Sequence, residues 1–153
     1  MKLVELKQFS GEECTIYTWF DDKLKFDTFI NELRETQIQK LILIAGRIKS
    51  IGQIGASANF FKLNEWAQDE KICCLYDDDI RLFCIRFKNE KILILGGGGV
   101  KGDDDRAWQD DAKLNREGNL IIEISKIINK KLENGSIYIS SNGKYLLGDL
   151  NIP

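Results

Sequence analysis

The chain has 153 residues, of which 43% are hydrophobic, and this size and composition suit one domain with an ordinary core. Its 22 basic and 24 acidic residues give a net charge of −2, so any contact with nucleic acid requires a local basic patch. No run approaches the roughly 18 apolar residues of a membrane span. The N-terminal segment MKLVELKQFSGEE is charged where a signal peptide needs its apolar stretch. We therefore expect a cytoplasmic protein without membrane contact.

The chain contains no histidine, which removes the commonest general base and excludes serine–histidine and cysteine–histidine nucleophile systems. Catalysis would have to use carboxylates, lysine, arginine, tyrosine or water. The cysteines are Cys14, Cys73, Cys74 and Cys84. Because neighbours on a strand point to opposite faces, Cys73 and Cys74 cannot jointly hold a metal from one face. We predict buried thiols, no metal centre and no cofactor.

The first third of the chain predicts a β element followed by a helical hairpin. Apolar runs at 3–6 and 14–20 predict two strands, and the spacing of apolar residues at 26–33 is that of one buried helical face. A second helix is predicted over 38–51, although LILIA alone could form a strand; it should end near Gly52 and Gly55. Its expected apolar positions are Ile38, Leu41, Ile42, Ala45, Ile48 and Ile51.

The segment 71–101 predicts an antiparallel meander, because its three β-rich runs are separated by DDD and KNEK. A further strand is predicted before it, in FFKLNEW at 60–66. The last run ends in the glycines 96–99, which we place at the rim of the sheet, either close to another backbone or at a bulge. A nucleotide cofactor is not predicted, because Lys101 is followed by Gly102 and three aspartates where a P-loop has serine or threonine.

The C-terminal part predicts one helix and one hairpin. The helix is marked by an apolar stripe over 120–132 and ends at Asn134 and Gly135, while Asn142-Gly143 between apolar runs indicates a type I′ hairpin turn. The acidic residues ahead of the helix either bind a divalent metal or favour its positive N-terminal end, and their pattern matches no EF-hand loop. These residues are Asp103, Asp104, Asp105, Asp110 and Asp111.

The predicted fold class is therefore α+β. An N-terminal β element and a helical hairpin should pack on an antiparallel meander sheet, followed by a C-terminal helix and a terminal β-hairpin over about 136–150. We expect a single domain spanning residues 1–153.

This order of elements resembles the RelE/ParE/HigB superfamily of toxin–antitoxin toxins over about residues 26–131. Within that stretch FFKLNEW resembles the family's lysine-leucine strand, DDDIRLFCIRF its strand with an apolar-Arg-apolar core, and LILGGGGVKG its rim strand. The C-terminal hairpin lies beyond the usual toxin core, so the chain would be an extended relative.

The resemblance implies an mRNA endoribonuclease of a type II toxin–antitoxin system, often dependent on the ribosome and silenced by an antitoxin protein. In such toxins the RNA 2′-hydroxyl attacks the adjacent phosphate while cations stabilise the developing charge. By matching positions, the implied catalytic residues are Arg81 on the sheet, Lys101 after the glycines, and Arg106. The implied RNA-binding residues are Lys62, Arg86 and Trp108.

Two departures from the family keep other interpretations open. The strand ICCLY lacks the lysines that such toxins carry, and the loop after the glycines is acidic, which repels RNA. Arg81 has a structural interpretation too, in which it pairs with the neighbouring carboxylates at 77–79. The alternative functions are a non-catalytic protein-interaction module on the same scaffold and an accessory domain without relation to toxins. Convergence of the basic side chains on one face would favour the toxin.

Overall fold

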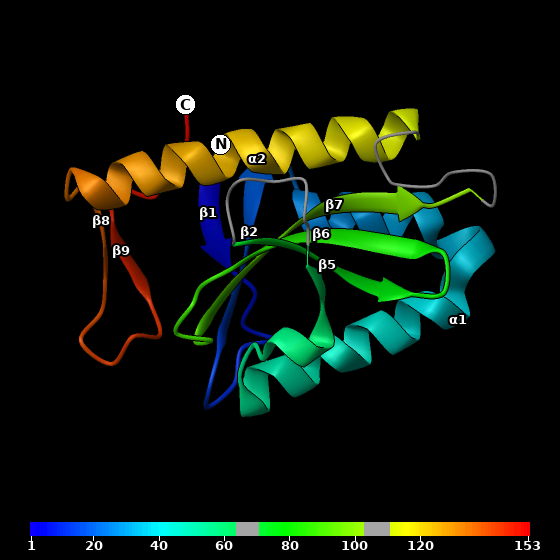
Figure 1. Cartoon of the computed structure of the whole chain (residues 1–153), viewed down its shortest axis with the longest axis horizontal. Coiled ribbons are helices and arrows are strands. Elements are labelled where there is room, and N and C mark those ends of the chain that lie inside the picture. The colour runs from blue at the N-terminus through cyan, green and yellow to red at the C-terminus, as the bar shows by residue number, and fades with distance from the viewer. Residues whose placement is uncertain (64–70, 103–110) are drawn as a thin grey trace.

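A computed structural model describes residues 1–63, 71–102 and 111–153 of the chain. Over these residues the fold is α+β, with two α-helices, a mixed sheet of five longer strands and a C-terminal β-hairpin (Figure 1). In pairing order these strands are β1 (Lys2–Glu5), β2 (Thr15–Asp21), β7 (Ile92–Val100), β6 (Ile80–Arg86) and β5 (Ile72–Asp77). The two-residue strands β3 (Lys23–Leu24) and β4 (Lys62–Leu63) pair with β2 and β5.

The two helices cover opposite faces of the sheet (Figure 1). Residues of α1 (Lys25–Ile54) share one hydrophobic cluster with Cys73 and Leu75, whereas residues of α2 (Ala112–Glu133) share another with Ile72 and Cys74. Successive side chains of β5 thus enter different cores, as strand geometry requires. All four cysteines are buried free thiols, which confirms that prediction. Burial raises the pKa of the Cys14 and Cys74 thiols to about 12.

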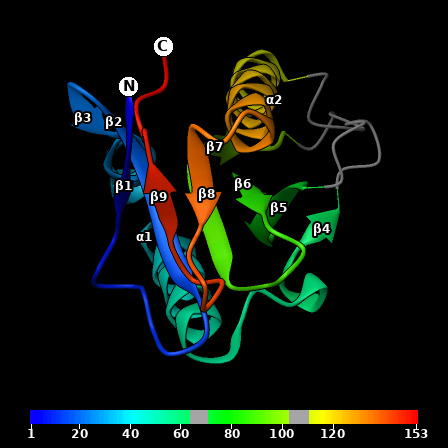
Figure 2. The same ribbon diagram turned by 90° about the vertical axis from the view of Figure 1, so that its left-hand side faces the viewer.

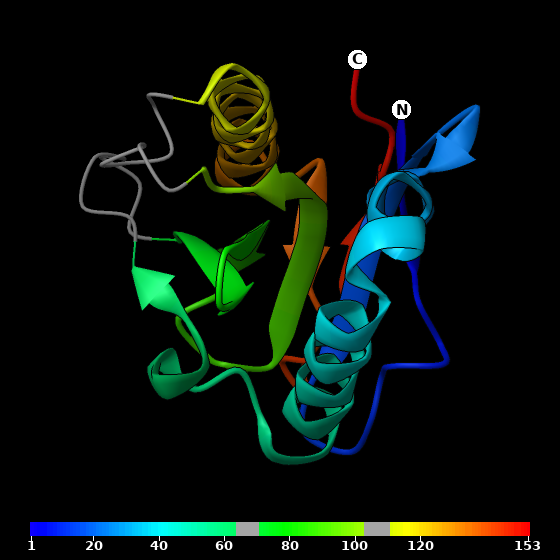
Figure 3. The same ribbon diagram turned by 90° about the vertical axis from the view of Figure 1, so that its right-hand side faces the viewer.

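The expected helical hairpin is wrong, because one 30-residue helix, α1, spans both predicted helices. Only Gln37 leaves helical geometry, at φ −131° and ψ 27°, and the helix bends without reversing (Figure 3). The physical reason is local: the segment RETQIQK contains no Gly, Pro, Asn or Asp that would favour a turn. The helical interpretation of LILIA is confirmed, and α1 ends next to Gly55, as predicted.

The buried face of the second half of α1 differs from the predicted stripe. Leu41, Ile44, Ile48 and Ile51 are buried at helical spacing. Two residues placed in that stripe, Ile38 and Ile42, are instead 46% and 56% exposed, and Leu43 beside them is 54% exposed. The bend at residue 37 and the position of the sheet select this face. Within the described residues, no helix is both long and apolar enough to cross a membrane.

The meander β5–β6–β7 is confirmed, but β7 is a central strand and not the rim. Its outer neighbour is β2, which runs parallel to it from Thr15 opposite Ile92 to Tyr17 opposite Ile94. Beyond this pairing, the Thr18 hydroxyl donates to the Leu95 carbonyl oxygen at 2.8 Å and accepts from the Phe26 amide at 3.2 Å. Thr18 therefore joins β2, β7 and the start of α1 where the two strands stop pairing.

The sequence predicted that the glycine run lies either close to another backbone or at a bulge, and both features are present. The register of β6 against β7 shifts between Leu82 and Cys84, which is the bulge. A Cβ on Gly98 would lie 1.8 Å from the Arg81 carbonyl oxygen, so only glycine fits at that point. A Cβ on Gly97 would lie 2.3 Å from Glu117 Oε2, so the run also lets α2 approach β7.

The C-terminal predictions hold in outline. The Asp111 carboxylate caps α2 by accepting from the Leu114 amide at 2.9 Å, which confirms the helix-start interpretation for this residue. The other four aspartates of the acidic segment lie outside the described residues. β8 (Ile137–Ile139) and β9 (Leu146–Gly148) form the expected hairpin, but of Asn142 and Gly143 only the glycine has positive φ, so the turn is not type I′.

The chain ends lie side by side at the edge of the sheet, where β1 runs (Figure 2). The Leu3 amide donates to the Leu150 carbonyl oxygen at 2.9 Å, and the Ile152 amide donates to the Met1 carbonyl oxygen at 2.7 Å. Of the strand predicted in FFKLNEW, β4 occupies Lys62–Leu63, whereas Phe60 ends the short 3-10 helix η1 (Ala58–Phe60). Residues 64–66 of that prediction lie outside the described residues.

Candidate functional site

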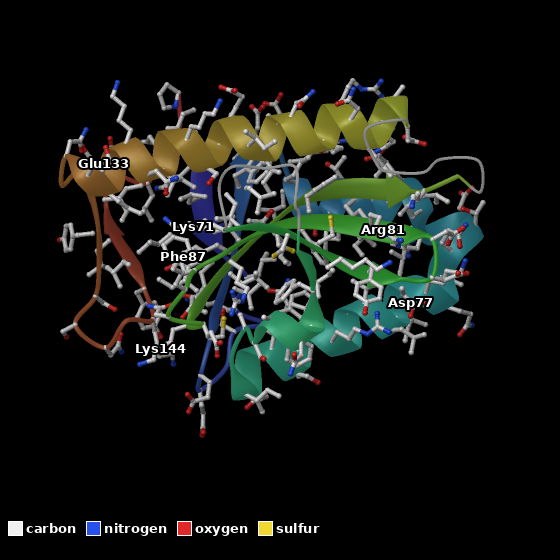
Figure 4. All side chains as sticks on the ribbon, viewed as in Figure 1. Lys71, Asp77, Arg81, Phe87, Glu133 and Lys144 are labelled. Carbon is white, nitrogen blue, oxygen red and sulfur yellow. The ribbon has the colours of Figure 1, made fainter. Side chains whose placement is uncertain are left out.

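Basic side chains gather at the end of the sheet where the turn between β5 and β6 lies. Arg81 is paired across the strands with Tyr76, and Lys62 on β4 is opposite Cys74. The Lys101 amide, just after β7, donates to the Asp79 carbonyl oxygen at 2.7 Å. Figure 4 shows Arg81 and Asp77 at this end of the molecule. We call Lys62, Arg81 and Lys101, together with Tyr76, the cationic cluster.

Tyr76 is the centre of the cationic cluster. The Lys62 ammonium lies 4.8 Å from the centroid of its ring, and the Arg81 guanidinium carbon lies 5.8 Å from it. Both distances fall within the range in which an aromatic ring attracts a cation. Arg47 of α1 reaches the same ring at 5.9 Å. It also donates to the Tyr76 carbonyl oxygen and, at 2.9 Å, to the Asp77 carboxylate.

Arg81 is held by the main chain of the turn. Its side chain donates to the carbonyl oxygens of Asp78 at 2.6 Å and Ile80 at 2.9 Å, and the residue is 9% exposed. Both bonds come from one terminal nitrogen, Nη1. These contacts orient the guanidinium, yet main-chain oxygens carry only partial charge and leave its positive charge in place.

The predicted pairing of Arg81 with its neighbouring carboxylates is wrong, because helix α1 pairs with those carboxylates. Lys40 contacts Asp78 at 3.0 Å and Asp79 at 2.7 Å, and Arg47 contacts Asp77 at 2.9 Å. Within the described residues no carboxylate forms an ion pair with Arg81. The carboxylates of the turn therefore do not neutralise Arg81.

The electrostatics of the cluster favour an anion. Partial removal of Lys62 from water lowers the pKa of its ammonium below that of an ordinary lysine, and the charges of Arg81 and Lys101 lower it further. Neighbouring positive charges disfavour the protonated form, whereas an anion between them would favour it. A phosphate group bound there would relieve this mutual repulsion and accept hydrogen bonds from the same cations.

Three of the predicted site residues thus lie together, and one does not. Lys62, Arg81 and Lys101 belong to the cluster. Arg86 lies at the opposite end of β6, where it donates to the Ala56 carbonyl oxygen at 2.6 Å and pairs with Glu90 at 3.1 Å. Arg106 and Trp108 lie outside the described residues.

The sequence did not lead us to Tyr76 of the cationic cluster or to Arg47, which contacts the Tyr76 ring. For Tyr76 a signal exists: if Asp78 and Asp79 are the central residues of a two-residue turn, counting back pairs residue 76 with residue 81. For Arg47 no local signal exists, because its place in the site depends on how α1 packs against the edge of the sheet.

The cations of the cluster are of the kind that polarise a phosphate, and Lys62, whose pKa is lowered, is suited to exchange a proton. In residues 1–63, 71–102 and 111–153 no group of three cysteine, aspartate or glutamate side chains gathers so that it could hold a metal ion. The groups that the cationic cluster presents are two ammonium groups, a guanidinium and a phenol.

Comparison with known proteins gives no match. No protein-family model, no curated protein and no solved structure is significantly similar to the chain. The functional proposals accordingly rest on the residues of this chain.

Proposed function

We propose that the chain is a RelE/HigB-like toxin of a type II toxin–antitoxin system that cleaves mRNA at the cationic cluster. The observation that carries this proposal is the convergence of Lys62, Arg81 and Lys101, three residues implied by the resemblance, at one end of the sheet. Two further observations support it: the turn carboxylates pair with α1, and the element order from α1 through the meander to α2 is the expected one apart from the hairpin.

The proposed reaction is an internal transesterification of RNA. The 2′-oxygen loses its proton and bonds to the adjacent phosphorus, while the bond from phosphorus to the 5′-oxygen breaks and that oxygen gains a proton. The products are a 2′,3′-cyclic phosphate and a 5′-hydroxyl end. Arg81 and Lys101 would stabilise charge on the phosphoryl oxygens. Lys62, whose pKa is lowered, would transfer the proton, since a group with a pKa nearer the working pH is more effective.

The partners under this proposal are mRNA, either alone or presented by a ribosome, and an antitoxin protein. A second function is favoured by a separate observation. The outer face of α1 exposes Ile38, Ile42 and Leu43 next to one another, as a protein-binding surface would. A non-catalytic interaction module on the same scaffold would use that face and would not need the cationic cluster.

The test is induced expression of the wild-type chain beside two variants of the cluster, with growth and total mRNA followed in parallel. Because Arg81 is buried, Arg81→Ala can fail by unfolding, so Lys62→Gln, at an exposed position, is the second variant. Arg86→Ala is the matched control, since it removes an arginine from the same strand outside the cluster.

The toxin proposal predicts growth arrest and mRNA with 5′-hydroxyl ends for the wild type and Arg86→Ala. Both effects should be lost in Lys62→Gln and Arg81→Ala. Normal growth with intact mRNA for the wild type would refute the toxin and leave the interaction module. Cleavage that persists unchanged in Lys62→Gln and in Arg81→Ala would show that the cluster is not the active site.

A further inference from the structure

Tyr76 contacts two cations of the cluster, Lys62 and Arg81, through its aromatic ring. It lies on β5 between Lys62 of β4 and Arg81 of β6, and all three side chains point to the face of the sheet that α2 covers. Its ring is half-buried, whereas Lys62 is exposed. The main chain of Tyr76 is in turn fixed by Arg47.

When no anion is bound, the cations of the cluster repel one another. Lys62 is a long, flexible side chain, and like charge from Arg81 and Lys101 repels it towards solvent. The negative face of the Tyr76 ring opposes this repulsion, because it attracts the Lys62 ammonium at 4.8 Å and the Arg81 guanidinium at 5.8 Å. A ligand phosphate then meets cations that are already in place and loses less binding free energy to their ordering.

We propose that Tyr76 is a positioning residue whose aromatic ring, and not its hydroxyl, holds Lys62 and Arg81 in register for a phosphodiester. This inference rests on the proposed function for the identity of the ligand, but the placement of Lys62 over the ring does not depend on it. The competing role is proton transfer by the Tyr76 hydroxyl, which requires the oxygen atom.

Two substitutions separate the roles. Tyr76→Phe keeps the ring and removes the hydroxyl, whereas Tyr76→Leu removes the ring and keeps an apolar side chain. Tyr145→Leu is the matched control, because the Tyr145 ring also holds a lysine, Lys144 at 5.8 Å, but on the C-terminal hairpin. The binding probe is a fluorescent single-stranded 2′-deoxy oligonucleotide, which carries phosphodiesters and lacks the attacking hydroxyl.

Tyr76→Leu should weaken binding of this oligonucleotide roughly tenfold, as expected when two cation–ring contacts are lost. Tyr76→Phe and Tyr145→Leu should stay within about twofold of the wild type, since phenylalanine retains the ring face. Cleavage of the corresponding RNA should follow the same order. Equal losses in Tyr76→Phe and Tyr76→Leu would overturn the proposal in favour of the hydroxyl, and wild-type binding by Tyr76→Leu would overturn it outright.

A second measurement keeps the inference separate from the proposed function. In nuclear magnetic resonance spectra the ring should shift the Lys62 ε-protons upfield in the wild type and in Tyr76→Phe, but not in Tyr76→Leu. If the wild type binds no oligonucleotide while this shift is present, the proposed function fails and the placement of Lys62 stands. If the wild type shows no such shift, the positioning role fails.

Discussion

The two ends of strand β6 each carry an arginine, and the two side chains have different surroundings. Arg86 is neutralised by Glu90 at 3.1 Å and anchors the Ala56 carbonyl oxygen at 2.6 Å. Arg81 contacts main-chain oxygens and the Tyr76 ring, with Lys62 and Lys101 nearby. Figure 4 shows the separation, with Arg81 and Asp77 at one end and Phe87, the residue after Arg86, towards the other.

This difference shows how one strand can use the same residue type for two purposes. A paired arginine contributes to stability and offers little to a ligand. An arginine whose charge is oriented but not neutralised retains its attraction for an anion. The two arginines differ because their neighbouring carboxylates pair differently. Glu90 pairs with Arg86, whereas the aspartates at 77–79 pair with Lys40 and Arg47 of α1.

The largest effect on stability should come from adding a methyl group at Gly98, which lies against the main chain of Arg81. Gly98→Ala would place a Cβ 1.8 Å from the Arg81 carbonyl oxygen, a main-chain atom that cannot move without breaking the β6–β7 pairing. We expect a loss of at least about 3 kcal/mol in the free energy of unfolding, measured by urea titration. Gly46→Ala, on the exposed side of α1 with open space around it, should instead stabilise the protein by about 0.5–1 kcal/mol. Equal stability of the two variants would contradict the packing at Gly98.

Removing Arg86, the arginine paired with Glu90, should lower stability and leave binding of the oligonucleotide unchanged. Arg86→Ala leaves the Ala56 carbonyl oxygen and the Glu90 carboxylate without this donor, which should cost about 1–2 kcal/mol of unfolding free energy. Urea titration measures this loss, and fluorescence anisotropy of the 2′-deoxy oligonucleotide should show unchanged affinity. An affinity loss as large as that of Lys62→Gln would mean that the two ends of β6 are not distinct.

The positive charge of Lys62 should contribute to the salt dependence of oligonucleotide binding. Lys62→Gln removes one cation from the cluster, so a plot of the logarithm of the binding constant against that of salt concentration should become shallower by about 0.7, as for one single-strand phosphate contact. Lys126→Gln is the control, because Lys126 is an exposed lysine of α2 whose described ion pair is with Glu123. A slope changed equally by both substitutions would show diffuse attraction without a defined site.

The smallest effect should be a pH dependence of binding. Because the pKa of Lys62 is lowered, its ammonium loses its proton below the ordinary lysine value of 10.5. Affinity for the 2′-deoxy oligonucleotide should therefore decline in alkaline solution before ordinary lysines titrate. Lys62→Arg should retain its affinity over the same range, since arginine stays charged. Parallel profiles for the two proteins would show that Lys62 does not contact the ligand.

Much of the secondary structure was predictable because local patterns encode it. The apolar spacing of α1 and α2, the polar breaks of the meander and the Asn-Gly pair of the hairpin each lie within a few residues of the element they define. The glycine run correctly indicated close approaches. The helical hairpin failed at Gln37, since a change in apolar spacing indicates a change of buried face and does not by itself require a reversal of the chain.

The resemblance pointed to Lys62, Arg81 and Lys101, which the structure brings together, while their role stays a prediction. Tyr76 was missed, although strand register places it opposite Arg81. Local sequence patterns indicate most of the elements, their order and the number of available cations, because these depend on neighbouring residues. Tertiary packing was needed to establish that β2 pairs with β7 and that residues of α1, and not Arg81, pair with the carboxylates of the turn. These contacts join residues that are far apart in the sequence, 39 positions for Lys40 and Asp79 and 77 positions for Thr18 and Leu95, so no local pattern specifies them.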